Sequence, residues 1–97
     1  MSNNLETKAR QLAELGHVTR LEVYQFLVTA GKTGFPVSAI QEQLGIPAST
    51  LSHHLSRLVR VGLVIQTREG RVLRCCANIP ELKSLADYLL SECCTSC

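Results

Sequence analysis

The feature that most constrains the fold is a pair of short helical patterns separated by only a few residues around Gly45. The first pattern places Ile40 and Leu44 on one apolar face, and the second begins near Pro47, a residue favoured in a first helical turn. Two helices joined so closely are typical of a helix-turn-helix. We therefore assign residues 37–61 to a helix-turn-helix.

A β-hairpin is predicted directly after this motif. The segment LVIQT is β-branched and apolar, REGR supplies a turn at Glu69 and Gly70, and VLRCCA resumes an extended pattern. A helix-turn-helix followed by a hairpin is a winged helix, so residues 63–77 are assigned to the wing. The segment GKTGFP, which precedes the helix-turn-helix, is predicted to be a loop.

Further helices are predicted on both sides of these elements. Apolar residues recur at helical spacing over residues 4–15, again through VTRLEVYQFLVTAG, and finally through IPELKSLADYLLSE, which leads into a cysteine tail at residues 92–97. The 97 residues fit a single domain, mainly α with a β-hairpin wing. Neither a signal peptide nor an apolar membrane span is visible, so we expect a cytoplasmic protein with no membrane partner.

Positive charge is concentrated in one part of the chain. Residues 48–78 have a net charge of +4, while the remaining residues sum to −2. Within the segment PASTLSHHLSRLVRVG, the helical period places three leucines on one face and short polar side chains on the other. Such side chains let a helix approach the major groove of DNA, and nearby arginines suit phosphates. The predicted DNA-binding residues from this pattern are Ser49, Ser52, His53, Ser56, Arg57, Arg60, Arg68 and Arg71.

An ordinary amphipathic surface helix with a solvated charged face is the alternative interpretation of the same pattern. The combination of VTRLEV, LSHHLSRL, GLV and REGR favours the DNA-binding interpretation, because across residues 11–74 it resembles the ArsR family of metalloregulatory winged-helix repressors. The resemblance implies a homodimer built by the first and last helices, binding to a palindromic double-stranded operator, and release by an inducer. In the family pattern the recognition-helix positions are filled by Ser49, Thr50, Ser52, His53 and His54.

Three of the five cysteines lie in the last five residues, at Cys93, Cys94 and Cys97. Thiolates select soft ions, and a trivalent arsenic or antimony centre suits three sulfur ligands. Continued as a helix, the tail would bring these three side chains within roughly one turn of each other. We therefore predict a metal site for As(III) or Sb(III) at Cys93, Cys94 and Cys97.

Cys75 and Cys76 are additional or alternative ligands. Adjacent strand residues point to opposite faces, so at most one of the two thiols is expected to join a given site. A site made from one strand thiol and one tail thiol would suit a monomethylated trivalent arsenical. The alternative for this pair is a small apolar residue that fills the core.

The predicted function is that of a repressor released from its operator by trivalent arsenic or antimony. Two alternatives remain open: a thiol-redox or polysulfide sensor that uses the spacing of Cys94 and Cys97, and a constitutive DNA-binding module. No enzyme is predicted, because the sequence offers neither a nucleophile with a base, nor a phosphate-binding glycine loop, nor a pair of carboxylates for acid–base chemistry. No organic cofactor is expected.

Overall fold

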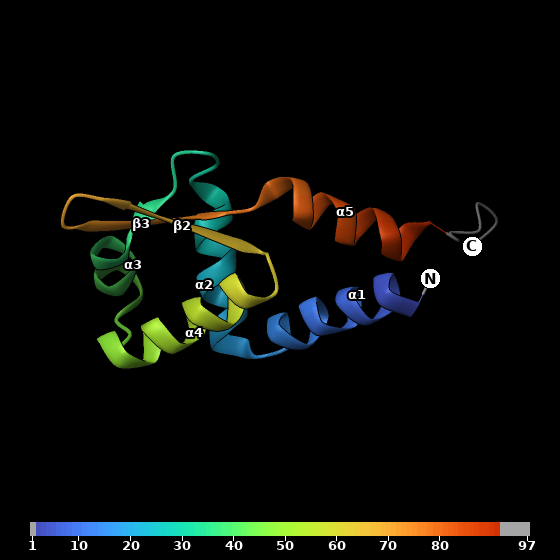
Figure 1. The fold of residues 1–97 in the computed structure, drawn as a ribbon. Helices are drawn as coiled ribbons and strands as arrows, with labels where there is room; N and C mark the ends of the chain where they lie inside the picture. Colours follow the sequence, from blue (N-terminus) through green and yellow to red (C-terminus); the bar gives the residue numbers. More distant parts are fainter. Residues whose placement is uncertain (1, 92–97) are drawn as a thin grey trace.

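The computed structural model describes residues 2–91 and shows the predicted winged helix-turn-helix, mainly α with a β-hairpin wing (Figure 1). The helices and strands in chain order are α1 (Ser2–Leu15), α2 (Val18–Thr29), β1 (Phe35–Pro36), α3 (Val37–Leu44), α4 (Ala48–Arg60), β2 (Val64–Glu69), β3 (Val72–Ala77) and α5 (Ile79–Leu90).

The core forms where the apolar face of α4 meets α2 and the inner side of the sheet. Leu51, Leu55 and Leu58 of α4 are buried, as are Val23 and Leu27 of α2. This spacing puts the three leucines on one side of the helix, so α4 buries one face and leaves the other to solvent. The hydrophobic effect therefore fixes which face of α4 is exposed.

The turn between α3 and α4 forms as the sequence predicts. Gly45 adopts the left-handed conformation, with a φ of +65°, and its N–H donates to the carbonyl oxygen of Gln41 at 2.9 Å. This is a helix end that favours glycine. Pro47 then stands at the N-cap position of α4, with extended backbone angles.

The wing is an antiparallel hairpin, as predicted, but its turn lies one position later in the chain than predicted. β2 and β3 pair from Val64 with Ala77 to Glu69 with Val72. Gly70 and Arg71 therefore form the two-residue loop, one position later than the turn predicted at Glu69 and Gly70. A φ of +64° at Gly70 shows why the turn lies there, because tight hairpin loops need positive φ.

The prediction of a loop for GKTGFP is wrong at its last two residues. Phe35 and Pro36 form β1, which pairs antiparallel with β3 and gives the sheet order β1-β3-β2. A strand of two residues is too short to produce an alternating pattern, so periodicity cannot reveal it. Gly34, which precedes it, has a φ of +67° and lies against the backbone of Cys75.

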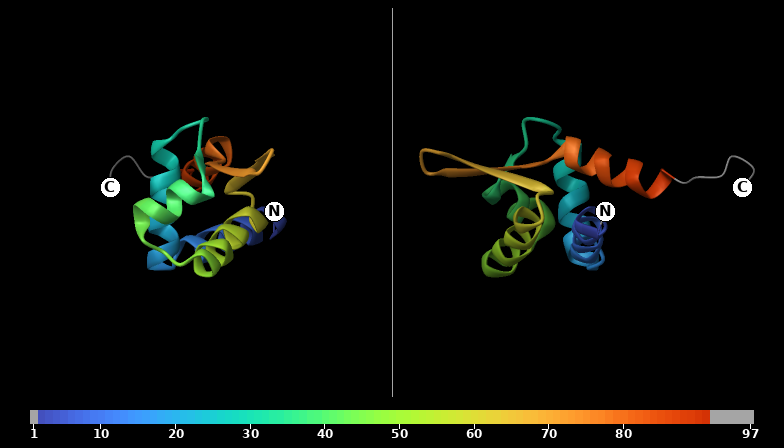
Figure 2. Two further views of the ribbon diagram at one scale, coloured as in Figure 1. Left: turned by 90° about the vertical axis from the view of Figure 1, so that its left-hand side faces the viewer. Right: turned by 45° about the vertical axis from the view of Figure 1, so that its right-hand side comes forward.

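Helices α1 and α5 lie side by side at the end of the molecule opposite the wing (Figures 1 and 2). Lys8 Nζ donates to Ser84 Oγ at 2.8 Å, and Gln11 Nε2 donates to Glu81 Oε2 at 2.7 Å. Hydrogen bonds between side chains therefore join these two helices. None of the helices in residues 2–91 is long and apolar enough to cross a membrane.

Gly34 should tolerate substitution much less well than Gly31. A Cβ at Gly34 would lie 2.2 Å from the Cys75 carbonyl oxygen, whereas a Cβ at Gly31 meets nothing within 4 Å. Both glycines have positive φ, so Gly31→Ala isolates the conformational cost, about 1–2 kcal/mol. Gly34→Ala adds the clash and should cost roughly 1–3 kcal/mol more. Urea unfolding of both variants tests this, and equal losses of stability would contradict it.

Candidate nucleic-acid interface

The exposed face of α4 presents a stripe of short polar side chains. Ser49, Ser52, His53 and Ser56 are all exposed, as is Thr50 beside them. Their spacing of three or four residues keeps the stripe on one side of the helix, opposite the buried leucines. Hydroxyl groups are able to meet either phosphates or base edges, so this face has the chemistry needed to enter a major groove.

The wing supplies cations that are not engaged in ion pairs within residues 2–91. Arg68 and Arg71 are exposed at the end of the hairpin. Arg74, on the neighbouring strand, is different, because its Nε donates to Glu69 Oε1 at 3.0 Å. The ion pair of Arg74 leaves Arg68 and Arg71 as the wing arginines available for phosphate groups.

His54 does not belong to the exposed face, which corrects the residue set that the family pattern implies. Its side chain is buried, and its Nδ1 accepts a hydrogen bond from Arg20 Nε at 3.3 Å. It lies three residues after Leu51 and four before Leu58, so the helical period turns it toward the core. Burial lowers the pKa of His54, and the nearby charge of Arg20 lowers it further. This environment favours the neutral imidazole.

Arg57 is also placed differently from the prediction. Its Nε donates to Glu14 Oε1 at 3.1 Å and its Nη2 donates to Glu14 Oε2 at 3.0 Å, so it binds the carboxylate with both nitrogens. Arg20 Nη1 donates to the same Oε1 at 2.6 Å. Arg57 therefore fixes α4 against α1 and is not available for DNA in the way that the exposed arginines are.

The hydrogen bond from Arg57 is the main cause that holds the pKa of Glu14 below its usual value, with the charges of Arg57 and Arg20 adding to it. No local sequence pattern indicates a role for Glu14 or Arg20. The partners Glu14 and Arg57 lie 43 residues apart, so no local spacing marks them as a pair.

The two hairpin cysteines occupy different environments, in agreement with their opposite directions along a strand. Cys75 is fully buried, and Gln66 Nε2 donates to its Sγ at 3.4 Å. Burial raises the pKa of this thiol, which disfavours the thiolate that binds metal. Cys76 is half-buried. The structure thus gives Cys75 the core-filling role that the sequence left open.

The part of the chain that the structure describes contains no group of three His, Cys, Asp or Glu side chains able to hold a metal ion. Cys93, Cys94 and Cys97 lie outside the described residues. The tail site therefore stays a prediction from the sequence.

Comparison with known proteins gives consistent matches. A family model described as a helix-turn-helix domain matches residues 15–67. The chain is 33% identical to a probable mercury resistance operon repressor of Streptomyces lividans over 91% of its own length and 66% of that protein, so it spans just under two thirds of this relative. An ArsR-like transcriptional regulator from a Rhodococcus strain superposes with a TM-score of 0.79 at 28% identity, covering 90% of this chain and 79% of that one.

A homodimeric winged helix-turn-helix DNA-binding domain from Mycobacterium bovis, described as a possible ArsR-family regulator, matches with a TM-score of 0.74 at 26% identity. That match covers 94% of this chain and 84% of the other. The sequence and structure matches therefore point to one class of protein.

Acid should destabilise the fold through His54. Because the folded state lowers the pKa of His54, the unfolded chain binds a proton at a higher pH, and stability falls as the pH drops below about 6.5. His54→Gln cannot titrate and should show a weaker loss of stability between about pH 7 and pH 5. Urea unfolding across this pH range measures the effect. The same pH dependence of stability in the native protein and in His54→Gln would refute the assignment.

Proposed function

Because the chain belongs to the ArsR family of winged-helix transcriptional regulators, we propose that it is a repressor that binds a palindromic operator as a homodimer. The observation that carries the proposal is that the polar stripe on α4 lies on the same side of the molecule as Arg68 and Arg71, the wing arginines that form no ion pair within residues 2–91. Figure 1 shows the N-terminal end of α4 and the tip of the wing on the same side of the molecule, away from the ends of α1 and α5. A duplex on that side would meet both elements.

The homodimer is supported by apolar surface on the two helices at the other end. Leu5 and Leu12 of α1 are exposed, as are Leu89 and Leu90 of α5, at 57% and 63%. Exposed large apolar side chains on adjacent helices are typical of an interaction surface. The M. bovis neighbour is described as homodimeric, which favours a second copy of this chain as the partner. Two-fold symmetry then matches a palindromic operator.

We further propose that a thiophilic ion bound by Cys93, Cys94 and Cys97 releases the repressor from DNA. Three thiolates suit trivalent arsenic or antimony, and the name of the S. lividans relative adds mercury(II) as a competing candidate. The sequence supports the tail as the site because three thiols lie within five residues. Cys76 is the half-buried thiol of the hairpin that remains as an additional ligand.

Hydrogen bonds that connect α5 with the end of α4 support this proposed regulation. Glu81 of α5 accepts from Gln11 Nε2, and the same nitrogen donates to the carbonyl oxygen of Val61 at 3.1 Å. Gln11 therefore touches both α5 and the residue directly after α4. Any shift of α5 caused by an ion at its end would change these contacts, and a typical coupling free energy is about 1–3 kcal/mol.

The wing arginines should contribute to DNA affinity according to their ion pairs. Arg71→Gln should weaken binding at every sequence and reduce the salt dependence by about one phosphate contact. Arg74→Gln is the matched control on the same hairpin, because Arg74 is already paired with Glu69. This substitution should change the salt dependence of DNA binding less than Arg71→Gln does. Fluorescence anisotropy over a salt series measures both, with a labelled duplex that the native protein selects from a random pool. An equal loss of DNA affinity and of salt dependence in Arg71→Gln and Arg74→Gln would contradict the proposed role of Arg71.

The inducer is tested on the same selected duplex under reducing conditions. Arsenite, antimonite and mercury(II) are titrated in turn against the protein–DNA complex, with zinc and a mild oxidant as controls. We expect a thiophilic ion to release DNA from the native protein and not from a Cys93→Ser, Cys94→Ser, Cys97→Ser variant. A matched Cys75→Ser, Cys76→Ser variant should still respond.

Each other outcome identifies a different mechanism. Release only by the oxidant would favour a thiol-redox sensor. Unchanged DNA binding in every titration would mean a constitutive DNA-binding module. A tail variant that still responds would move the site to the hairpin cysteines.

A further inference from the structure

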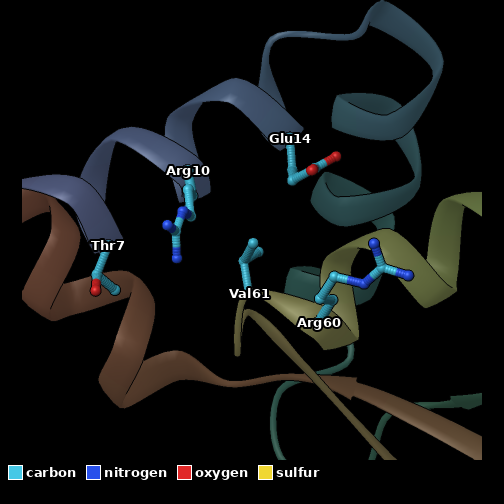
Figure 3. A pocket seen from close by; sticks show the side chains of 5 residues that line it. All are labelled: Thr7, Arg10, Glu14, Arg60 and Val61. Atoms are coloured by element: carbon cyan, nitrogen blue, oxygen red, sulfur yellow. The ribbon is translucent and has the colours of Figure 1, made fainter.

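An open pocket lies where the middle of α1 faces the C-terminal end of α4. Its volume is about 410 Å³, and it is lined by Thr7, Arg10 and Glu14 of α1, together with Arg60 and Val61. Figure 3 shows Arg10 reaching down from α1 on one side of Val61 and Arg60 extending from the end of α4 on the other. Two guanidinium groups from different helices therefore flank the same pocket.

The pocket has a surplus of positive charge. Both oxygens of Glu14 are already bound, since Oε1 accepts from Arg20 and Arg57 and Oε2 accepts from Arg57. Arg10 and Arg60 form no ion pair with any residue of 2–91. The four guanidinium groups and one carboxylate in and behind the pocket leave a net charge of +3. Such a pocket attracts an anion.

The pocket also continues the DNA-facing stripe of α4. Arg60 lies eleven residues after Ser49, so the helical period returns it to the same face, about 16 Å further along the axis. A helix that enters a major groove of about 12 Å with its N-terminal residues brings its far end close to the flanking phosphates. The anion that best fits the location of the pocket is thus part of the same duplex.

We propose that Arg10 and Arg60 form a phosphate site that binds the backbone of the operator at the C-terminal end of the recognition helix. This inference rests on the proposed function and assigns to α1, through Arg10, a direct contact with DNA. Guanidinium groups bind phosphate oxygens with two parallel hydrogen bonds, which fixes the protein in position without reading the base sequence. A free inorganic phosphate has the same chemistry and is distinguished in the test.

The first experiment compares native protein with Arg10→Gln, Arg60→Gln and the control Lys32→Gln on the selected duplex and on a scrambled one. Lys32 is an exposed cation in the segment between α2 and β1, so its removal changes the net charge equally. Arg10→Gln and Arg60→Gln should each weaken binding to both duplexes by a similar factor and lower the salt slope by about one. Thermal unfolding of each variant checks that the fold is retained.

The second experiment locates the phosphate. Single methylphosphonate substitutions remove one charge at a time from the duplex. At the contacted position the substitution should weaken binding of the native protein more than binding of Arg10→Gln, since the variant retains only the Arg60 contact with that phosphate. Inorganic phosphate is titrated in parallel against the melting temperature of native protein and Arg10→Gln.

Several results would overturn the proposal. An Arg10→Gln protein with native affinity and salt slope would remove Arg10 from the DNA interface and leave the repressor proposal intact. Protection of native protein alone by inorganic phosphate, with DNA binding unchanged in Arg10→Gln, would assign the pocket to a small anion instead. Failure of the native protein to select any duplex would contradict the proposed function itself, and the phosphate site with it.

Discussion

The position of the recognition helix depends on one buried carboxylate. The carboxylate of Glu14 in α1 accepts three hydrogen bonds, one from Arg20 of α2 and two from Arg57 of α4. A buried charge is costly unless it is paired and hydrogen-bonded, and the three donors meet that condition. The arrangement is specific to one geometry, because the two bonds from Arg57 require α4 to lie at a defined place relative to α1.

The same interaction explains which parts of α4 are free to meet DNA. Arg57 and His54 both point inward to the charged cluster around Glu14 and Arg20, so the side of the helix that bears them is held by the protein. The hydroxyl stripe that begins at Ser49 lies on the exposed side of the helix, where it is accessible to a ligand. One face of α4 therefore holds the helix in place against the protein, and the opposite face is left to contact DNA.

The sequence predicts the elements whose pattern is local. The apolar face of α4, the glycine at the α3–α4 turn and the wing all follow from periods of two or 3.6 residues and from glycine chemistry. The contacts of Glu14 with Arg57 depend on the packing of distant segments, which no spacing encodes. β1 is missed for a related reason, because its two residues become a strand only when Phe35 meets Cys75 across the sheet.

The candidate site is likewise predictable only in part. The exposed residues of the α4 stripe follow from helical periodicity. His54 was assigned from the family pattern alone, although the period turns it toward the leucines. No sequence pattern connects Arg10 with Arg60, because the two residues lie 50 positions apart. They are brought together only by the pocket between α1 and α4.

The division of the arginines shows why net charge alone says little about the partner of this protein. Arg20 and Arg57 share the single carboxylate of Glu14, and Arg74 is bound to Glu69, so all three side chains are held by contacts within the protein. The arginines that form no ion pair within residues 2–91 lie in the pocket and on the wing, namely Arg10, Arg60, Arg68 and Arg71. A modest overall charge of +2 is therefore compatible with a strongly positive surface, since the fold decides which cations remain available to phosphate.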